Sequence, residues 1–280
     1  MTISEISRDT LQDVQGLPDT RGIALDEVGV EGVRYPLLIS DALGNKRETV
    51  ATVTMSVSLA DHVKGAHLSR FIDVLHAWRD QLGSQAVTLM ADDLRQRMGS
   101  ATARVTLTFP YFLERHAPVT GIASFMDYTC TLTAAANDLG EELNLGVKVP
   151  VTSVCPCSKA ISDRGAHNQR GWITIDAKPR TPATGLWFDD LIDVAESAGS
   201  SPVYALLKRP DERHVTMAGY DNPVFVEDMI RTVAGALHGD PRIAAYRVRV
   251  VNDESIHNHA AYAQIPWTAA AATVAEAGDD

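Results

Sequence analysis

Residues 143–159 read L-N-L-G-V-K-V-P-V-T-S-V-C-P-C-S-K and join a regular apolar pattern to two cysteines. Apolar residues occupy every second position of the first part, which predicts a half-buried β-strand. These residues are Leu143, Leu145, Val147 and Val149. The predicted strand runs directly into the cysteines, so we expect the fold to deliver this segment to a functional loop.

The loop that follows, residues 153–171, concentrates side chains with metal-binding or reactive chemistry. Cys155 and Cys157 lie one residue apart, and His167 follows in the same polar segment. Thiolate and neutral imidazole are good ligands for zinc and similar metals, and cations near a thiol favour its ionisation. A packing role remains an alternative, because Cys-x-Cys is not a zinc-knuckle motif and buried cysteines often act as small hydrophobes. The nearby cations are Lys159, Arg164 and Arg170.

Outward from this loop, the same order of elements is predicted twice. In the first half, strands at 35–42 and 53–59 precede helices at 68–78 and 87–98, and strands at 105–109 and 121–135 follow. In the second half, strands at 143–149 and 171–177 precede helices at 186–198 and 223–239, with Asn222 as N-cap, and strands at 246–250 and 259–265 follow. Cys130 falls inside a predicted strand and is interpreted as a packing residue.

This repeated strand–strand–helix–helix–strand–strand order predicts an α+β fold of antiparallel sheets with paired helices stacked on one face. The predicted organisation is an N-terminal arm at 1–33, a first unit at 34–136, a second unit at 137–267 and a frayed tail at 268–280. Such sheets leave long edges, which favours an oligomer.

Composition narrows the classes of function. A formal net charge of −11 over 280 residues argues against a general nucleic-acid or anionic-membrane binder, so an anionic substrate needs a local basic pocket. Three cysteines form no disulfide framework, which favours a reducing cytoplasm. The N-terminal residues 1–17 lack the apolar core of a signal peptide, and no segment approaches the about 20 apolar residues of a membrane span.

Four further segments carry concentrated polar groups, at 64–71, 207–216, 221–228 and 252–259. His257 and His259, one residue apart on a predicted emerging strand, are expected to point the same way. Each group alone is typical of a solvated charge or a capped turn. Together they supply an unusual set of candidate ligands: Cys155, His167, Glu212, Glu254, His257 and His259.

Long motifs in this order resemble the type IB GTP cyclohydrolase I family, over about residues 23–266. They are E-V-G-V-E-G-V-R-Y-P (27–36), K-G-A-H-L-S-R-F (64–71), S-V-C-P-C-S-K (153–159), G-A-H-N-Q-R-G (165–171), L-K-R-P-D-E (207–212), N-P-V-F-V-E-D (222–228) and E-S-I-H-N-H-A (254–260). The resemblance implies tandem tunnelling-fold (T-fold) units in a cytoplasmic homotetramer with sites near subunit interfaces. It also implies hydrolysis of GTP to 7,8-dihydroneopterin triphosphate and formate, with a divalent metal that is zinc, manganese or iron.

The resemblance and the chemistry together assign roles. Metal ligands are Cys155, His167 and Glu212, and the catalytic residues are Cys155, Cys157, Glu254, His257 and His259, with Glu254 as general acid or base. Glu227 is the purine anchor, since a carboxylate accepts two hydrogen bonds from N1–H and the 2-amino group. Candidates for the triphosphate are Lys159, Arg164, Arg170, Lys208 and Arg209.

Two other functions remain as alternatives. One is a T-fold reductase that uses a cysteine as covalent nucleophile on a nitrile and needs a nicotinamide cofactor. The other is a metal-stabilised binding protein without turnover, which accounts for the cysteines and histidines but leaves Glu227 and Glu254 unexplained.

Overall fold

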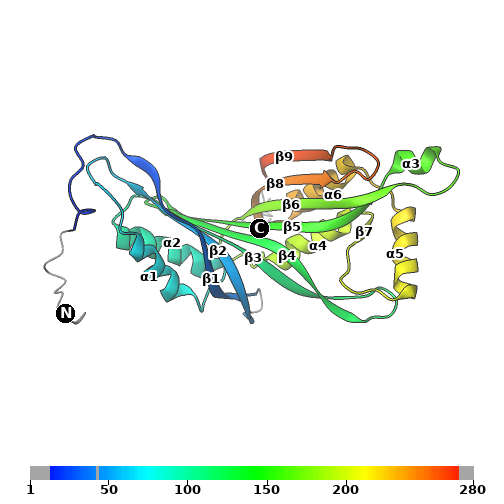
Figure 1. The fold of residues 1–280 in the computed structure, drawn as a ribbon, viewed down its shortest axis with the longest axis horizontal. Helices are drawn as coiled ribbons and strands as arrows, with labels where there is room; N and C mark the ends of the chain where they lie inside the picture. Colours follow the sequence, from blue (N-terminus) through cyan, green and yellow to red (C-terminus); the bar gives the residue numbers. More distant parts are fainter. Residues whose placement is uncertain (1–12, 42–43, 271–280) are drawn as a thin grey trace, which may run out of the picture.

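Alternating apolar residues build one continuous antiparallel sheet, shown in Figure 1. The computed structural model describes residues 13–41 and 44–270. Within these residues the sheet has nine strands in the order β1-β2-β3-β4-β5-β6-β8-β9, with the short β7 paired to β5. The strands are β1 (Leu25–Ser40), β2 (Lys46–Leu59), β3 (Ala103–His116), β4 (Ala123–Asn137), β5 (Gly140–Val154), β6 (Asn168–Pro179), β7 (Ser201–Pro202), β8 (Ile243–Asn252) and β9 (Ala261–Ala269).

Helices cover one face of this sheet in two groups, and helices on one face were predicted from the sequence. Helix α2 packs on β3 and β4, α4 packs on β5, and α6 packs on β8 and β9. Buried side chains of both groups join a single apolar core that runs the length of the sheet. The helices of the described residues are α1 (Leu68–Trp78), α2 (Ser84–Met98), α3 (Pro156–Ile161), α4 (Phe188–Ala198), α5 (Arg209–Asp221) and α6 (Val226–Gly239).

The two expected sheets are one sheet, because β4 and β5 pair with each other from Thr129–Lys148 to Asn137–Gly140. Strand β1 begins at Leu25, inside the segment expected to be an arm, and β9 extends to Ala269, past the expected end of the second unit. Residues 1–12 of the expected arm and 271–280 of the expected tail lie outside the described residues.

The predicted helix at 223–239 begins later than expected. Helix α6 starts at Val226 with Phe225 as N-cap residue, and the Asp228 carboxylate accepts a hydrogen bond from the Phe225 backbone N–H. Asn222 is instead the C-cap residue of α5. The prediction of Asn222 as an N-cap was therefore wrong, because the carboxylate of the first turn of α6 does the capping. Helices α3 and α5 were not predicted.

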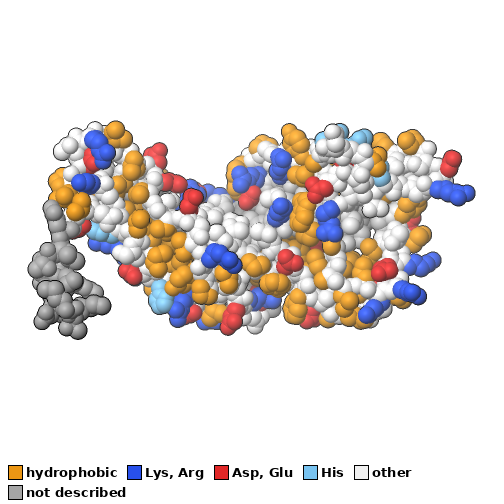
Figure 2. Space-filling view, viewed as in Figure 1, with side chains coloured by type: hydrophobic (Ala, Val, Ile, Leu, Met, Phe, Trp, Pro, Cys, Tyr) orange, Lys and Arg blue, Asp and Glu red, His pale blue; other side chains and the backbone are white. Residues whose placement is uncertain are grey.

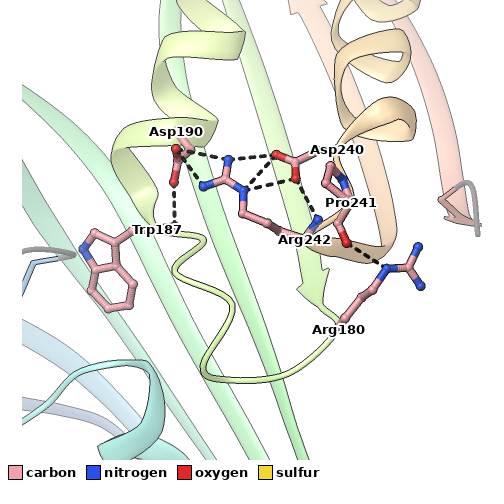
Figure 3. Close-up of polar contacts among 6 residues, drawn as sticks. All are labelled: Arg180, Trp187, Asp190, Asp240, Pro241 and Arg242. Carbon is pink, nitrogen blue, oxygen red and sulfur yellow. Dashed lines mark hydrogen bonds and ion pairs between the residues drawn. The ribbon is translucent and has the colours of Figure 1, made fainter. Parts of the chain in front are cut away.

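An ion cluster holds the start of α4 against the turn between α6 and β8 (Figure 3). The Arg242 guanidinium donates hydrogen bonds to Asp190 and Asp240, and the Asp190 carboxylate caps α4 by accepting from the Trp187 backbone N–H. Hydrogen bonding from Arg242 holds the pKa of Asp240 below its ordinary value, although burial acts in the opposite direction. The cluster fixes the two helices that lie beneath the second half of the sheet.

Candidate active site

Polar side chains replace apolar ones where three neighbouring strands reach the same end of the core. Ser153 on β5, Gln169 on β6 and Asn252 on β8 lie on the helix-covered face and are 1%, 8% and 2% exposed. Ser153 pairs with Gln169 in the β5–β6 register. These three residues line a cavity of about 180 Å³ that the N-terminal turn of α6 closes from the other side.

Direct hydrogen bonds connect this buried polar group. The Ser153 hydroxyl donates to the backbone carbonyl of Val224 at 3.0 Å and accepts from Asn252 Nδ2 at 3.0 Å. Gln169 Nε2 lies 3.4 Å from both Ser153 Oγ and Glu254 Oε1. An ordered polar network therefore forms one side of the cavity, and apolar residues such as Val224, Val226 and Ala261 line the rest.

Cys155 and His167 meet where β5 and β6 end. The Cys155 backbone N–H donates to the His167 carbonyl at 3.1 Å, so the two residues lie side by side. Cys155 is the N-cap residue of α3, where its sulfur accepts a hydrogen bond from the Ser158 backbone N–H at 3.4 Å, and it lines the cavity. Pro156 at the first helical position favours the start of α3 at this point.

Two carboxylates reach the same cavity from different elements. Glu254 follows β8, and its Oε2 lies 4.0 Å from His167 Nδ1; both side chains are largely buried, at 12% and 13% exposure. Glu227 lies on the first turn of α6, exposed to solvent, and also lines the cavity. The structure thus brings Cys155, Glu227 and Glu254 to one cavity, with His167 in contact with its rim.

His257 and His259 lie in the β8–β9 connection, since β9 begins only at Ala261. Their rings stack with centroids 5.1 Å apart and an interplanar angle of 14°, and both residues are exposed. The prediction that they point the same way is confirmed, although they lie on a loop rather than on a strand. In Figure 2, pale blue histidine atoms gather above this end of the molecule.

Cys157 is an exposed free thiol on α3 and is not among the residues that line the cavity. Lys159, also on α3, donates from Nζ to the Tyr220 backbone carbonyl and lies 4.3 Å from the centroid of the Tyr220 ring. Its ammonium therefore ties α3 to the end of α5. Arg164 and Arg170 are exposed.

Helix α5 carries the remaining predicted site residues on its first turn and its N-cap. Glu212, Lys208 and Arg209 are all exposed. Figure 2 shows blue side chains gathered at the end of the molecule formed by α3 and α5, so a local basic surface exists despite the net negative charge.

The chemistry of Cys155 and His167 fits a zinc-like metal. No three His, Cys, Asp or Glu side chains of the described residues are already arranged around a metal position, so Glu212 is not gathered with that pair.

Asp211 fastens the N-terminus of α5 and was not predicted. Its side chain is fully buried and accepts hydrogen bonds from the backbone N–H groups of Val119, Thr120 and Lys208 and from the Thr120 hydroxyl, at 2.8 to 2.9 Å. Burial acts to raise the pKa of Asp211, but these hydrogen bonds outweigh it and hold the pKa well below its ordinary value.

Sequence reasoning also missed Ser153, Gln169 and Asn252. A signal was present, since each continues the inward-facing phase of an apolar strand: Ser153 follows Val149 and Val151, and Asn252 follows Val248 and Val250. A polar residue at a buried strand position requires a partner, and three such residues on adjacent strands indicate a shared network.

Comparison with solved structures finds the same overall fold in other proteins. The chain resembles uricase from Arthrobacter globiformis with a TM-score of 0.51 and 11% identity, covering 91% of this chain and 96% of that one. A highly active mutant of Bacillus sp. TB-90 urate oxidase gives a TM-score of 0.51 and 11% identity, covering 88% and 100% of the two chains. At this identity the likeness concerns the fold alone.

Sequence comparison identifies the family. Residues 11–263 match the family described as type I GTP cyclohydrolase folE2. GTP cyclohydrolase FolE2 of Methylococcus capsulatus is 47% identical over 255 residues, covering 91% of this chain and 94% of the relative. That of Pseudothermotoga lettingae is 45% identical, covering 90% and 97%. The chain belongs to the type I GTP cyclohydrolase folE2 family. Among the described residues, no helix has the length and apolar character to cross a membrane.

Proposed function

We propose that this chain is a type IB GTP cyclohydrolase I that hydrolyses GTP to 7,8-dihydroneopterin triphosphate and formate. This step opens tetrahydrofolate biosynthesis and supplies deazaguanine tRNA modification. The observation that carries the proposal is the cavity that Cys155, Glu227 and Glu254 share, because it puts a thiol, a purine anchor and an acid–base group within one small space. A cytoplasmic location is part of the proposal, and the three free cysteines agree with it.

In this proposal each residue has a defined task. Glu227 accepts hydrogen bonds from N1–H and the 2-amino group of guanine, which orients C8 toward the interior. Glu254 transfers protons during hydration of C8 and opening of the imidazole ring. His257 and His259 carry protons at the solvent side. Cys157 is also assigned a catalytic role. The triphosphate is held by cations of α3, its loop and α5: Lys159, Arg164, Arg170, Lys208 and Arg209.

A divalent metal (zinc, manganese or iron) is part of the proposal, with Cys155, His167 and Glu212 as ligands. When bound, it supplies a Lewis acid that makes water nucleophilic at neutral pH. Cys155 and His167 are the pair that the fold already brings together, and Glu212 has to be brought to them.

We also propose tandem T-fold units that assemble as a homotetramer, with active sites near subunit interfaces. Two features support this. Strands β1 and β9 are the two edge strands of the sheet, and among the described residues the outer edge of β1 is hydrogen-bonded only near Leu38 and Ser40, by the segment that contains Arg79 and Leu82. The sheet face opposite the helices exposes the aromatic side chains of Phe112 (46%) and Phe125 (61%), which lie on adjacent strands.

The test is an assay of purified protein with GTP and added Mn²⁺ or Zn²⁺, which follows pterin fluorescence and formate release. We expect both products in equal amounts. In Glu227→Gln, kcat/KM is expected to fall by about 10²-fold or more, since the carboxylate that accepts two hydrogen bonds from the base is lost. The matched control is Glu141→Gln, an exposed glutamate at the far end of β5. No pterin from GTP, with nicotinamide-dependent reduction of a purine-like nitrile instead, would replace this proposal with the reductase.

A further inference from the structure

The backbone carbonyl of Val224 sets the direction of the hydrogen bonds around Ser153. The backbone carbonyl of Val224 can only accept, so the single hydroxyl hydrogen of Ser153 is donated to it. Ser153 Oγ must then accept from its other neighbours. The amide group of Asn252 therefore turns Nδ2 toward Ser153, at 3.0 Å.

The same reasoning fixes the amide of Gln169. One end of this amide lies 3.4 Å from Ser153 Oγ, which has no hydrogen left to donate, and 3.4 Å from the Glu254 carboxylate, which accepts. That end is therefore the NH₂ group, and the carbonyl oxygen Oε1 faces His167 Nδ1 at 2.9 Å. An oxygen acceptor at this distance requires a hydrogen on Nδ1.

We propose that Gln169 is a positioning residue that holds neutral His167 in the Nδ1–H tautomer and leaves Nε2 as the nitrogen with a free lone pair. Metal-binding histidines are oriented in this way by a group that accepts from the other ring nitrogen. Gln169 also joins His167 to Glu254, so one buried side chain aligns the imidazole and the acid–base carboxylate. The inference rests on the proposed function in taking His167 as a metal ligand.

The first test needs no variant and no metal. Solid-state ¹⁵N NMR of metal-free, [¹⁵N]histidine-labelled full chain at a pH where imidazole is neutral reports which ring nitrogen carries hydrogen, and His167→Asn identifies the resonance. We expect hydrogen on Nδ1 of His167. Hydrogen on Nε2 in the wild-type protein overturns the inference.

The second test removes the acceptor. In Gln169→Leu, which keeps the size of the side chain, we expect the Nδ1–H preference to disappear and the affinity for Zn²⁺, measured against a chelating dye, to fall about 10- to 100-fold. The matched control is Gln264→Leu on the exposed strand β9, where neither quantity should change.

Two outcomes count against the inference: an unchanged tautomer in Gln169→Leu, or an equal affinity loss in Gln264→Leu. A separate result would contradict the proposed function. If wild-type protein neither binds Zn²⁺ nor converts GTP, that function is wrong, while the His167 spectrum still decides the role of Gln169.

Discussion

The three cysteines of this chain occupy three different environments. Cys157 is exposed on α3, Cys155 is half-buried at the cavity, and Cys130 is fully buried in β4. Burial, together with the negative charge of Asp189, raises the pKa of the Cys130 thiol well above its ordinary value. The prediction that Cys130 is a packing residue is confirmed. Thiolate is the reactive form, so the exposure of each sulfur and the charges near it determine the relative reactivity of the three thiols.

We therefore expect an ordered reaction with a thiol reagent at neutral pH. Cys157 should react first, Cys155 more slowly, and Cys130 only after unfolding, because its sulfur has neither access nor a stabilised thiolate. Mass spectrometry of peptides after timed alkylation measures this order. Early labelling of Cys130 in folded protein would contradict the burial described here.

Substitution separates the roles assigned to the two loop cysteines. Cys155→Ala is expected to lose bound metal and turnover together, because a three-ligand site cannot easily spare its thiolate. Cys157→Ala and Cys157→Ser are expected to keep metal and fold while turnover falls by about 10²-fold or more, the scale of a lost acid–base group. Elemental analysis and the GTP assay measure both effects. Near-normal turnover in Cys157→Ala would remove Cys157 from the mechanism.

At the scale of elements, α5 differs from the other long helices because it buries almost no apolar surface. Its buried residues are Asp211 and Gly219 alone. Its attachments are polar: Asp211 at the N-terminus, and Asn222 with Lys159 near the C-terminus. A helix held in this way opens locally more easily than one packed into a core.

Asp211→Asn should therefore loosen α5 without unfolding the sheet. Amide hydrogen exchange in α5 is expected to accelerate at least about 10-fold, while exchange in β3 to β6 stays unchanged. Asp221→Asn, at the exposed end of the same helix, is the matched control. Acceleration throughout the sheet would show that Asp211 supports the global fold instead.

The pKa of Asp211 adds a pH dependence to that comparison. Because its pKa is depressed in the folded protein, the stabilisation is complete above the ordinary aspartate pKa of about 4 and is lost as pH falls toward the folded value. The stability difference between wild type and Asp211→Asn should thus be constant near neutrality and shrink below about pH 4. Denaturant midpoints measured from pH 7 downward check this.

Elements with an apolar pattern could be predicted from the sequence, and elements without one could not. Val53, Met55 and Val57 alternate because β2 has one buried face, and all three are buried as that pattern requires. Helix α5 has no apolar stripe, since its buried residues are only Asp211 and Gly219, and it was therefore not predicted. The contacts of Gln169 could not be predicted from the sequence, because they join a residue of β5 to residues in the loops before β6 and after β8.

At the scale of the whole molecule, the single sheet has two edge strands, β1 and β9, and one face without helices. We expect a particle of about four times the 30.3 kDa chain mass by light scattering at micromolar concentration. Phe125→Glu, which places a charge on the helix-free face, should shift the protein toward smaller species. Leu139→Glu, at the exposed tip of the β4–β5 hairpin, serves as the control. A fully active monomer would rule out assembly and place the complete active site within one chain.

The order of strands in the sheet also follows the order of synthesis. Each long strand pairs with the long strand that precedes it in the chain, so the sheet grows at one edge as residues leave the ribosome. The β1–β4 half with α1 and α2 can associate before β5 is made, and it then offers β4 as a template for the next strand. The proposed catalytic residues all belong to the later half. A nascent chain therefore acquires its scaffold first and its chemistry last.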